Sequence, residues 1–187
     1  MYDTRNKILE VADDLVQRVG LNAMSYKHIS DAVGIRKASI HHHFPKKENL
    51  IDELLERCSS SYGEKYQEIA DGSDRAPVKL RKLAAVFEEG LSNRKLCLVG
   101  SISTSSTTLQ EGSCQILRST IENTVSIYAT IFAQGQREGS LKIPGTADEA
   151  AFAFFSLLVG AQSTARSYGG IQMFNLATET IISGFEK

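Results

Sequence analysis

The sequence contains no tryptophan, only three prolines and only three cysteines among its 187 residues. So few prolines favour long, unbroken helices over a turn-rich β fold, because proline interrupts a helix. The cysteines (Cys58, Cys97 and Cys114) lie far apart, which argues against a disulfide framework and favours a reducing, cytoplasmic compartment. The longest nearly apolar run, Ala150 to Ala161, is too short to span a bilayer, and the first residues lack the apolar stretch of a signal peptide. No membrane partner is therefore expected.

The motifs of the common enzyme and metal sites are also missing. The sequence has no Cys-x-x-Cys pair, no His-Glu-x-x-His and no Gly-x-x-x-x-Gly-Lys-Ser/Thr phosphate loop. The run His41-His42-His43 does not suggest a metal site, since successive helical residues point about 100° apart. A Ser/Thr cluster at 101–108 has no histidine after residue 43 to activate a nucleophile, so it indicates surface or a polar cavity lining. We expect no metal, no cofactor and no enzymatic activity.

What the sequence does contain is helical periodicity. With 42% apolar and 23% charged residues, the chain can bury a core. No segment alternates with period two over a useful length, so the predicted fold is all-α, with about nine helices. We place a small N-terminal domain at 1–50 and a larger domain at 51–187. Apolar stripes and helix-ending glycines predict helices near 4–19, 26–33, 36–44, from 47 onward, 77–91, 113–138, 148–166 and 171–185.

Charge is distributed unevenly along this chain of formal net charge -1. Residues 1–50 carry eight Lys/Arg against six Asp/Glu, whereas residues 51–187 carry thirteen against sixteen. All four histidines also lie in the first fifty residues, and between Lys27 and Lys47 the only acid is Asp31. A short basic segment in a neutral chain suggests a small anion-facing module on a larger body, although a solvated surface has the same composition.

The short helices around Gly34 predict a helix-turn-helix. In such a unit the second helix lies in the major groove of DNA and presents its first residues to the base edges. Arg36, Lys37 and Ser39 lie on that helix with His41 and His42. The start of the preceding helix, Ser25-Tyr26-Lys27, and the pair Lys46-Lys47 are positioned for phosphates. The alternative is an ordinary corner between two helices of a small bundle.

The stretch from Met24 to Leu50, MSYKHISDAVGIRKASIHHHFPKKENL, closely resembles the TetR family of bacterial repressors. The resemblance also covers the amphipathic helix that ends at Gly20 and, less specifically, the length and helical layout of the remainder. The Gly135-Gln136-Arg137-Glu138-Gly139 ending of a long helix is a further match.

The resemblance implies a homodimer that binds a near-palindromic DNA operator and is released by a small effector. Phosphate contacts would fall on Ser25, Tyr26, Lys47 and the run His41-His42-His43, and base contacts on Arg36, Lys37 and Ser39. His41 departs from the family, which usually has tyrosine at that position. Because an imidazole is shorter than a phenol and titrates near neutral pH, we expect DNA binding to strengthen at lower pH.

Two further sets of residues follow from composition and from the resemblance. The run 150–161 is apolar on all faces, so one face is expected to pack on the protein's own core and another on a partner subunit. The last two helices form the dimer interface in the family, which implies a role for Phe154, Leu158, Ala161, Phe174, Ala177, Ile181 and Phe185. Monomer core is the alternative for these positions. Apolar and aromatic positions of the middle helices predict a pocket for an apolar or aromatic effector, lined by Phe87, Cys97, Ile102, Leu117, Ile121, Tyr128, Phe152 and Phe155.

Cys97 has two readings. It opens a Cys-Leu-Val-Gly run near Arg94 and Lys95. A similar run occurs in one TetR subgroup, some members of which use a thiol there to sense electrophiles or oxidants. A small buried hydrophobe is the more common role of such a cysteine.

For the whole chain we expect a ligand-responsive transcriptional repressor. The alternatives are a non-inducible DNA-binding protein, and a helical ligand carrier or enzyme with a vestigial N-terminal domain.

Overall fold

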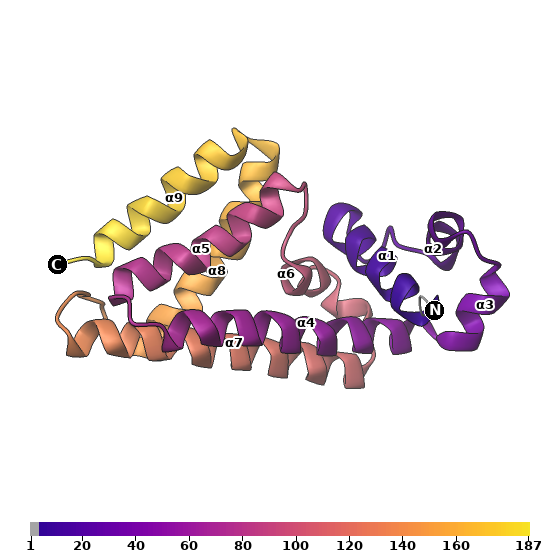
Figure 1. The fold of residues 1–187 in the computed structure, drawn as a ribbon, viewed down its shortest axis with the longest axis horizontal. Helices are drawn as coiled ribbons and strands as arrows, with labels where there is room; N and C mark the ends of the chain where they lie inside the picture. Colours follow the sequence, from indigo (N-terminus) through magenta and orange to yellow (C-terminus); the bar gives the residue numbers. More distant parts are fainter. Residues whose placement is uncertain (1–3) are drawn as a thin grey trace. The chain divides into compact units, whose positions relative to one another are not determined.

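A computed structural model describes residues 4–187, and over that range the chain is all-α, as predicted (Figure 1). Nine α-helices and one 3-10 turn account for this part of the chain. They are α1 (Thr4–Val19), α2 (Tyr26–Val33), α3 (Lys37–His43), α4 (Lys47–Asp71), α5 (Ala76–Ser92), α6 (Leu98–Ser103), η1 (Ser106–Thr108), α7 (Glu111–Arg137), α8 (Ala147–Ser167) and α9 (Gly170–Phe185). The predicted bounds agree to within about two residues. Only α6 and η1, in the Ser/Thr-rich stretch, had no predicted counterpart.

The chain divides into two compact units whose boundaries interleave along the sequence. The first contains the chain up to Ser59 together with Leu98–Thr120, and the second contains Ser60–Cys97 and Ile121–Lys187. The division differs from a single cut after residue 50, because α6 and the first part of α7 belong to the same unit as α1–α3. The long helices α4 and α7 each contribute to both units.

The first unit is built around the inner face of α1. Ile8, Leu9, Ala12 and Val16 are buried at helical spacing. α1 packs against α2 and α6, and α2 packs against α3. The start of α7 is attached to α4 in the same unit, where Ser113 donates a hydrogen bond to the Asp52 carboxylate. The helix-turn-helix is thus one side of a larger helical core.

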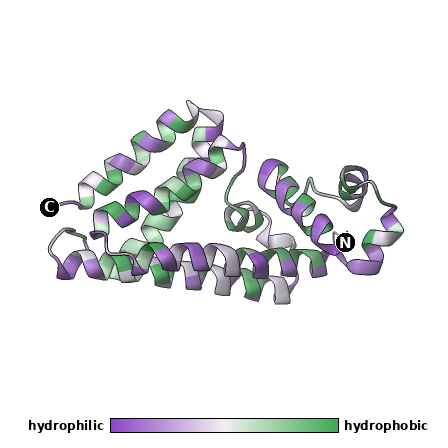
Figure 2. Cartoon of the chain, viewed as in Figure 1, coloured by the Kyte–Doolittle hydropathy of each residue, from purple (hydrophilic) through white to green (hydrophobic). Residues whose placement is uncertain are grey.

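The second unit has an aromatic core. α9 packs against α5 and α8 (Figure 1), and Figure 2 shows hydrophobic and hydrophilic residues alternating along α9, the pattern of a helix with one buried side. Phe132 of α7 meets Phe154 of α8 and Phe185 of α9 edge to face, with ring centroids 5.9 and 5.4 Å apart. Such contacts add to the free energy gained from burying the rings.

A polar network joins the end of α4 to the start of α5 and the end of α7. The buried Lys79 ammonium donates to the Ala70 carbonyl at 2.5 Å and to Gln134 Oε1 at 2.7 Å. Glu138 accepts from the Ala76 N–H at 2.8 Å and from the Ser140 hydroxyl. The Ser140, Ala76 and Gln134 hydrogen bonds lower the pKa of Glu138 to about 2. In its ionised form, the Glu138 carboxylate therefore stabilises the N-terminus of α5.

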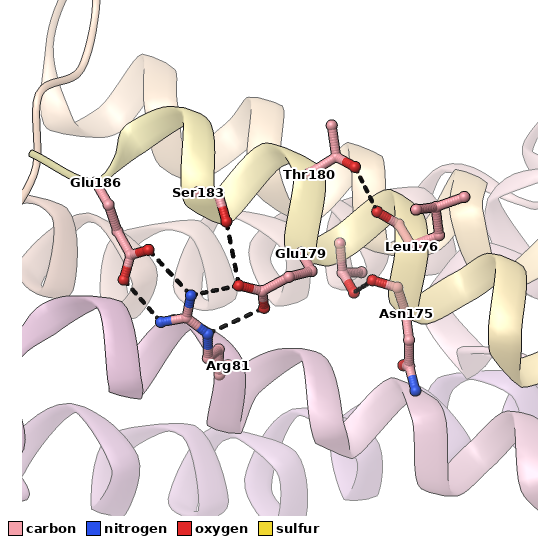
Figure 3. Close-up of polar contacts among 8 residues, drawn as sticks. Arg81, Asn175, Leu176, Glu179, Thr180, Ser183 and Glu186 are labelled. Atoms are coloured by element: carbon pink, nitrogen blue, oxygen red, sulfur yellow. Dashed lines mark hydrogen bonds and ion pairs between the residues drawn. The ribbon is translucent and has the colours of Figure 1, made fainter.

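A charged cluster attaches α9 to α5. The Arg81 guanidinium donates to Glu179 through two nitrogens and to Glu186 at 2.8 and 3.1 Å, and Ser183 donates to Glu179 at 3.2 Å (Figure 3). Hydrogen bonds from Arg81 hold the pKa values of both carboxyl groups below their ordinary range. Next to this cluster, the chain ending pairs with residues 140–142, where the Lys142 N–H donates to the Phe185 carbonyl at 2.7 Å.

None of the helices within residues 4–187 is both long enough and apolar enough to cross a membrane.

Candidate functional site

A capped helix, a tight turn and a second short helix bring most of the predicted DNA-contacting residues together. Ser25 begins α2, and its hydroxyl accepts a hydrogen bond from the His28 N–H at 3.3 Å. α2 ends at Gly34, which has a left-handed φ of 78°. The N–H groups of Gly34 and Ile35 both donate to the Ser30 carbonyl, at 2.9 and 3.1 Å. Glycine allows this reversal without steric cost, so α3 begins only three residues later.

The orientation of α3 is fixed from its inner side. Ile40 and Phe44 are fully buried, and the Tyr26 hydroxyl of α2 donates to the Phe44 carbonyl at 2.8 Å. The Tyr26 ring meets the His41 imidazole edge to face, 4.8 Å between centroids. From α1, the Arg5 guanidinium lies 5.0 Å from the centre of the Phe44 ring. Contacts from α1 and α2 therefore hold the C-terminal end of the short helix in place.

The outer side of this unit carries the basic groups. Arg36 precedes α3 as its N-cap residue and Lys37 is its first residue. Five of the predicted DNA contacts are exposed here: Arg36, Lys37, His41, His42 and Lys46. Ser25, Ser39 and His43 are half-buried. These exposed side chains can place cationic and neutral hydrogen-bond donors against an anionic surface. Arg36 and Lys37, at the start of α3, are among them.

Three other predicted contacts already have partners within the chain. The Lys27 ammonium pairs with Asp31 at 2.8 Å, and because both side chains are well exposed this pair is weak. The half-buried Lys47 ammonium donates to the Leu21 carbonyl at 3.0 Å, and burial lowers the pKa of Lys47. Burial and, to a lesser degree, Glu48 raise the pKa of Tyr26 to about 12. The Lys47 and Tyr26 side chains thus hold the domain together, a role that their sequence pattern does not reveal.

The predicted effector-pocket residues are only partly brought together. Phe87, Tyr128 and Phe155 form one buried aromatic cluster in the second unit, with the Phe155 ring 6.4 Å from Phe87 and 6.1 Å from Tyr128. Cys97 is half-buried and acts electrostatically on the Tyr128 hydroxyl. The others are placed differently: Ile102 and Leu117 are buried in the first unit, Ile121 is half-buried, and Phe152 is 57% exposed on α8. Phe152 therefore lies outside the aromatic cluster's buried environment.

One residue of this region had no sequence signal. Gln162 of α8 is fully buried, and its amide oxygen accepts from the Cys97 N–H at 2.6 Å. Its amide nitrogen donates to the Phe87 carbonyl at 2.8 Å. Gln162 thereby fixes the backbone at Cys97, where the irregular segment after α5 ends. Because its partners are 65 and 75 residues away, only the folded chain reveals this role.

The predicted interface residues of α8 and α9 divide by burial. Phe154, Leu158 and Phe174 are buried within the second unit, so in this chain they are core residues that a partner cannot reach. Ala161, Ala177 and Phe185 are half-buried, and Ile181 is 37% exposed. The large apolar side chains that face solvent on these helices are Phe152 on α8 and Ile171, Leu176 and Ile181 on α9. An apolar surface exists there, but on partly different residues from those predicted.

No group of three or more His, Cys, Asp or Glu side chains within residues 4–187 is arranged to hold a metal ion. The features that the described chain does show are a capped helix-turn-helix with an exposed basic side, followed by a helical body with an aromatic core. Together they define the class of helix-turn-helix proteins with an additional all-α domain.

Comparison with known proteins places the chain within this class. Residues 8–54 match the family described as bacterial regulatory proteins, tetR family. A 71-residue segment, 37% of this chain, is 39% identical to the HTH-type transcriptional repressor KstR2 of Rhodococcus jostii and spans 35% of it. A 62-residue segment, 33% of this chain, is 36% identical to the HTH-type transcriptional regulator AcrR of Shigella flexneri and spans 29% of it. The chain thus spans about a third of the length of these curated relatives.

The whole chain also resembles a solved structure. A TetR-family transcriptional regulator from Agrobacterium tumefaciens superposes with a TM-score of 0.93 at 26% identity, over 98% of both chains. Residues 8–54 therefore carry the match to the tetR family of bacterial regulatory proteins, and the chain has the fold of a TetR-family regulator. The resemblance to the TetR family and the all-α fold, both predicted from the sequence, are thereby confirmed.

Proposed function

We propose that the protein is a DNA-binding transcriptional regulator that represses genes by occupying an operator. The observation that carries this proposal is the basic outer side of α3, which is held rigidly from behind by Ile40, Phe44 and the Tyr26 hydrogen bond. A rigid helix with exposed donors at its start is what base recognition in the major groove requires. The name of the curated relative KstR2, a transcriptional repressor, supports the same function for the segment that it shares with this chain.

The exposed residues differ in their proposed roles. Arg36 and Lys37, at the start of α3, are suited to the acceptor edges of guanine, and Ser39 to either donors or acceptors. Ser25, Lys27, Lys46 and the histidines of α3 are suited to phosphate oxygens. For Lys27 this requires exchange of Asp31 for a phosphate, which costs little at such an exposed pair. For Tyr26 and Lys47 we propose positioning roles instead.

DNA binding is tested by fluorescence anisotropy with a duplex taken from upstream of the protein's own gene. Arg36→Ala and Lys37→Ala should each weaken binding by about 5- to 150-fold, the range expected for a base contact. Lys142→Ala removes an exposed positive charge from the second unit and should leave affinity nearly unchanged. Affinity should also fall steeply with salt, because phosphate contacts release counterions. Salt-independent binding, or none, would favour the ligand-carrier or enzyme alternative.

We further propose a homodimer that uses the exposed apolar side of α8 and α9. Two copies would present two recognition helices to half-sites about 34 Å apart on one face of DNA. Phe152 and Leu176 are the largest exposures on this side, at 57% and 59%. Phe152→Glu and Leu176→Glu should convert the dimer to monomers in sedimentation experiments. Val78→Glu is the matched control, since Val78 is a similarly exposed apolar residue, at 42%, on α5.

Finally, we propose that a small apolar or aromatic effector releases the DNA. The buried cluster of Phe87, Tyr128 and Phe155 supports an apolar site in the second unit. The effector would act by binding more tightly to a conformation that does not fit the operator. A compound that raises the melting temperature and also lowers DNA affinity would meet this expectation. If no compound in a broad screen stabilises the protein, the non-inducible alternative is favoured.

A further inference from the structure

The hydroxyl of Tyr128, on α7, stands out in the core of the second unit. The side chain is fully buried, and within residues 4–187 no group meets its oxygen at hydrogen-bonding distance and angle. Burial raises the pKa of Tyr128 well above its ordinary value, while Tyr66 acts in the opposite direction as a weak hydrogen-bonding neighbour. The phenol is therefore neutral and retains a proton that it can donate.

The surroundings of this hydroxyl are aromatic. The Tyr128 ring lies edge to face against Tyr66 of α4 at 5.2 Å and against Phe155 of α8 at 6.1 Å, and it is tilted against Phe154 at 6.4 Å. Phe87 of α5 extends the cluster through Phe155. The Cys97 side chain is near enough to act on the hydroxyl electrostatically. These five neighbours are four aromatic rings and one thiol.

A buried hydroxyl whose proton meets no acceptor within the described residues needs an explanation. Buried polar groups in folded proteins are almost always hydrogen-bonded, because the bonds to water that they lose on folding must be replaced. The Gln162 amide, which is also buried in this unit, is already hydrogen-bonded at both ends, to the Cys97 N–H and the Phe87 carbonyl. A bound molecule with an accepting oxygen would supply the missing partner.

Resting on the proposed role as an effector-responsive regulator, we propose that Tyr128 donates the hydrogen bond that recognises the effector. The chemistry of the cluster selects a neutral, ring-containing molecule with one accepting oxygen, such as an aromatic ketone, ester or amide. The ring would take over edge-to-face contacts now made among Tyr66, Phe87 and Phe155. A carboxylate or ammonium ligand would be buried here without an opposite charge, which is unfavourable. The buried Lys79 does not offer one, since Ala70 and Gln134 bind its ammonium.

The test compares pairs of probes that have the same shape but differ in the acceptor. Acetophenone and α-methylstyrene differ only in C=O against C=CH2, as do the larger benzophenone and 1,1-diphenylethylene. Affinities are measured by ligand-observed NMR titration on the full chain. The wild-type protein should bind the ketone of at least one pair about five- to tenfold more tightly than its hydrocarbon partner, the contribution of one neutral hydrogen bond.

Tyr128→Phe keeps the ring and removes only the hydroxyl, so the variant should fold and should bind both members of the pair equally. Tyr62→Phe removes an exposed hydroxyl from α4 and should keep the wild-type preference. Three results would each overturn the proposal: no binding of any probe, equal binding by the wild type, or a ketone preference that survives in Tyr128→Phe. Salt-dependent DNA binding by the ligand-free wild type is measured in parallel, so that failure of the DNA-binding function is seen separately from failure at Tyr128.

Discussion

Replacing Gly34 with alanine tests whether the turn between α2 and α3 depends on a left-handed backbone. A Cβ atom at Gly34 would meet nothing within 4 Å, so crowding cannot contribute. The φ of 78° remains, and for alanine the left-handed region costs roughly 1–2 kcal/mol. Part of this is offset because alanine loses less backbone entropy on folding, by about 0.4–1 kcal/mol. We expect Gly34→Ala to lower the free energy of unfolding by about 1 kcal/mol.

Gly63, inside α4, supplies a control of opposite sign. A Cβ atom there also meets nothing within 4 Å, and the backbone is helical. Gly63→Ala should therefore raise the free energy of unfolding by roughly 0.5–1 kcal/mol, the ordinary helix preference for alanine over glycine. Gly34→Asn should be milder than Gly34→Ala, since asparagine tolerates the left-handed region better than other non-glycine residues.

The three variants are compared with the wild type by urea denaturation followed by circular dichroism. The protein concentration is fixed, because the stability of the proposed dimer would depend on it. The midpoints of Gly34→Ala and Gly63→Ala should move in opposite directions. If Gly34→Ala is neutral or stabilising, the left-handed turn is not a constraint in solution and does not determine the position of α3.

Three other changes have outcomes set by the structure. Gly135→Ala would place a Cβ atom 2.3 Å from Leu141 Cδ1 and 2.9 Å from Ala76 Cβ, so the thermal midpoint should fall, by the equivalent of about 1–3 kcal/mol. Glu138 has a folded pKa of about 2, below its unfolded value, so the stability it contributes is present above about pH 4.5 and is lost as the pH falls through 2. The melting temperatures of Glu138→Gln and wild type should thus differ at pH 6 and converge toward pH 2; a constant gap would contradict this. Comparing operator affinity at pH 6 and pH 8 at fixed salt tests the expectation, drawn from the sequence at His41, that binding strengthens at lower pH; equal affinities would refute it.

The sequence was most informative where local patterns decide the structure. Apolar spacing and glycines placed the long helices to within about two residues, and Ser25 and Gly34 were predicted in the cap and turn positions they occupy. Local patterns could not show that α6 forms in a Ser/Thr-rich stretch. There the backbone is helical because Leu98, Val99 and Ile102 are buried, and burial is a tertiary effect.

Side-chain roles that depend on partners distant in the sequence could not be predicted from local patterns. The sequence suggests that Lys47 is a phosphate ligand, whereas in the structure its ammonium donates to the Leu21 carbonyl, 26 residues away. An all-apolar helix such as α8 does not reveal which face turns outward, so Phe154 and Leu158 were assigned to the interface although they are core residues, while Phe152 is exposed. In each case the deciding information is the three-dimensional contact rather than the type of residue.

The burial of Lys79 has a practical consequence for chemical labelling. Reagents that acylate or methylate amines react with exposed lysines of the folded protein, whereas the Lys79 nitrogen is enclosed and hydrogen-bonded to Ala70 and Gln134. Its modification therefore requires the junction of α4, α5 and α7 to open. The rate at which peptides containing Lys79 gain mass during a labelling time course would report that opening directly, under native conditions and without any engineered probe.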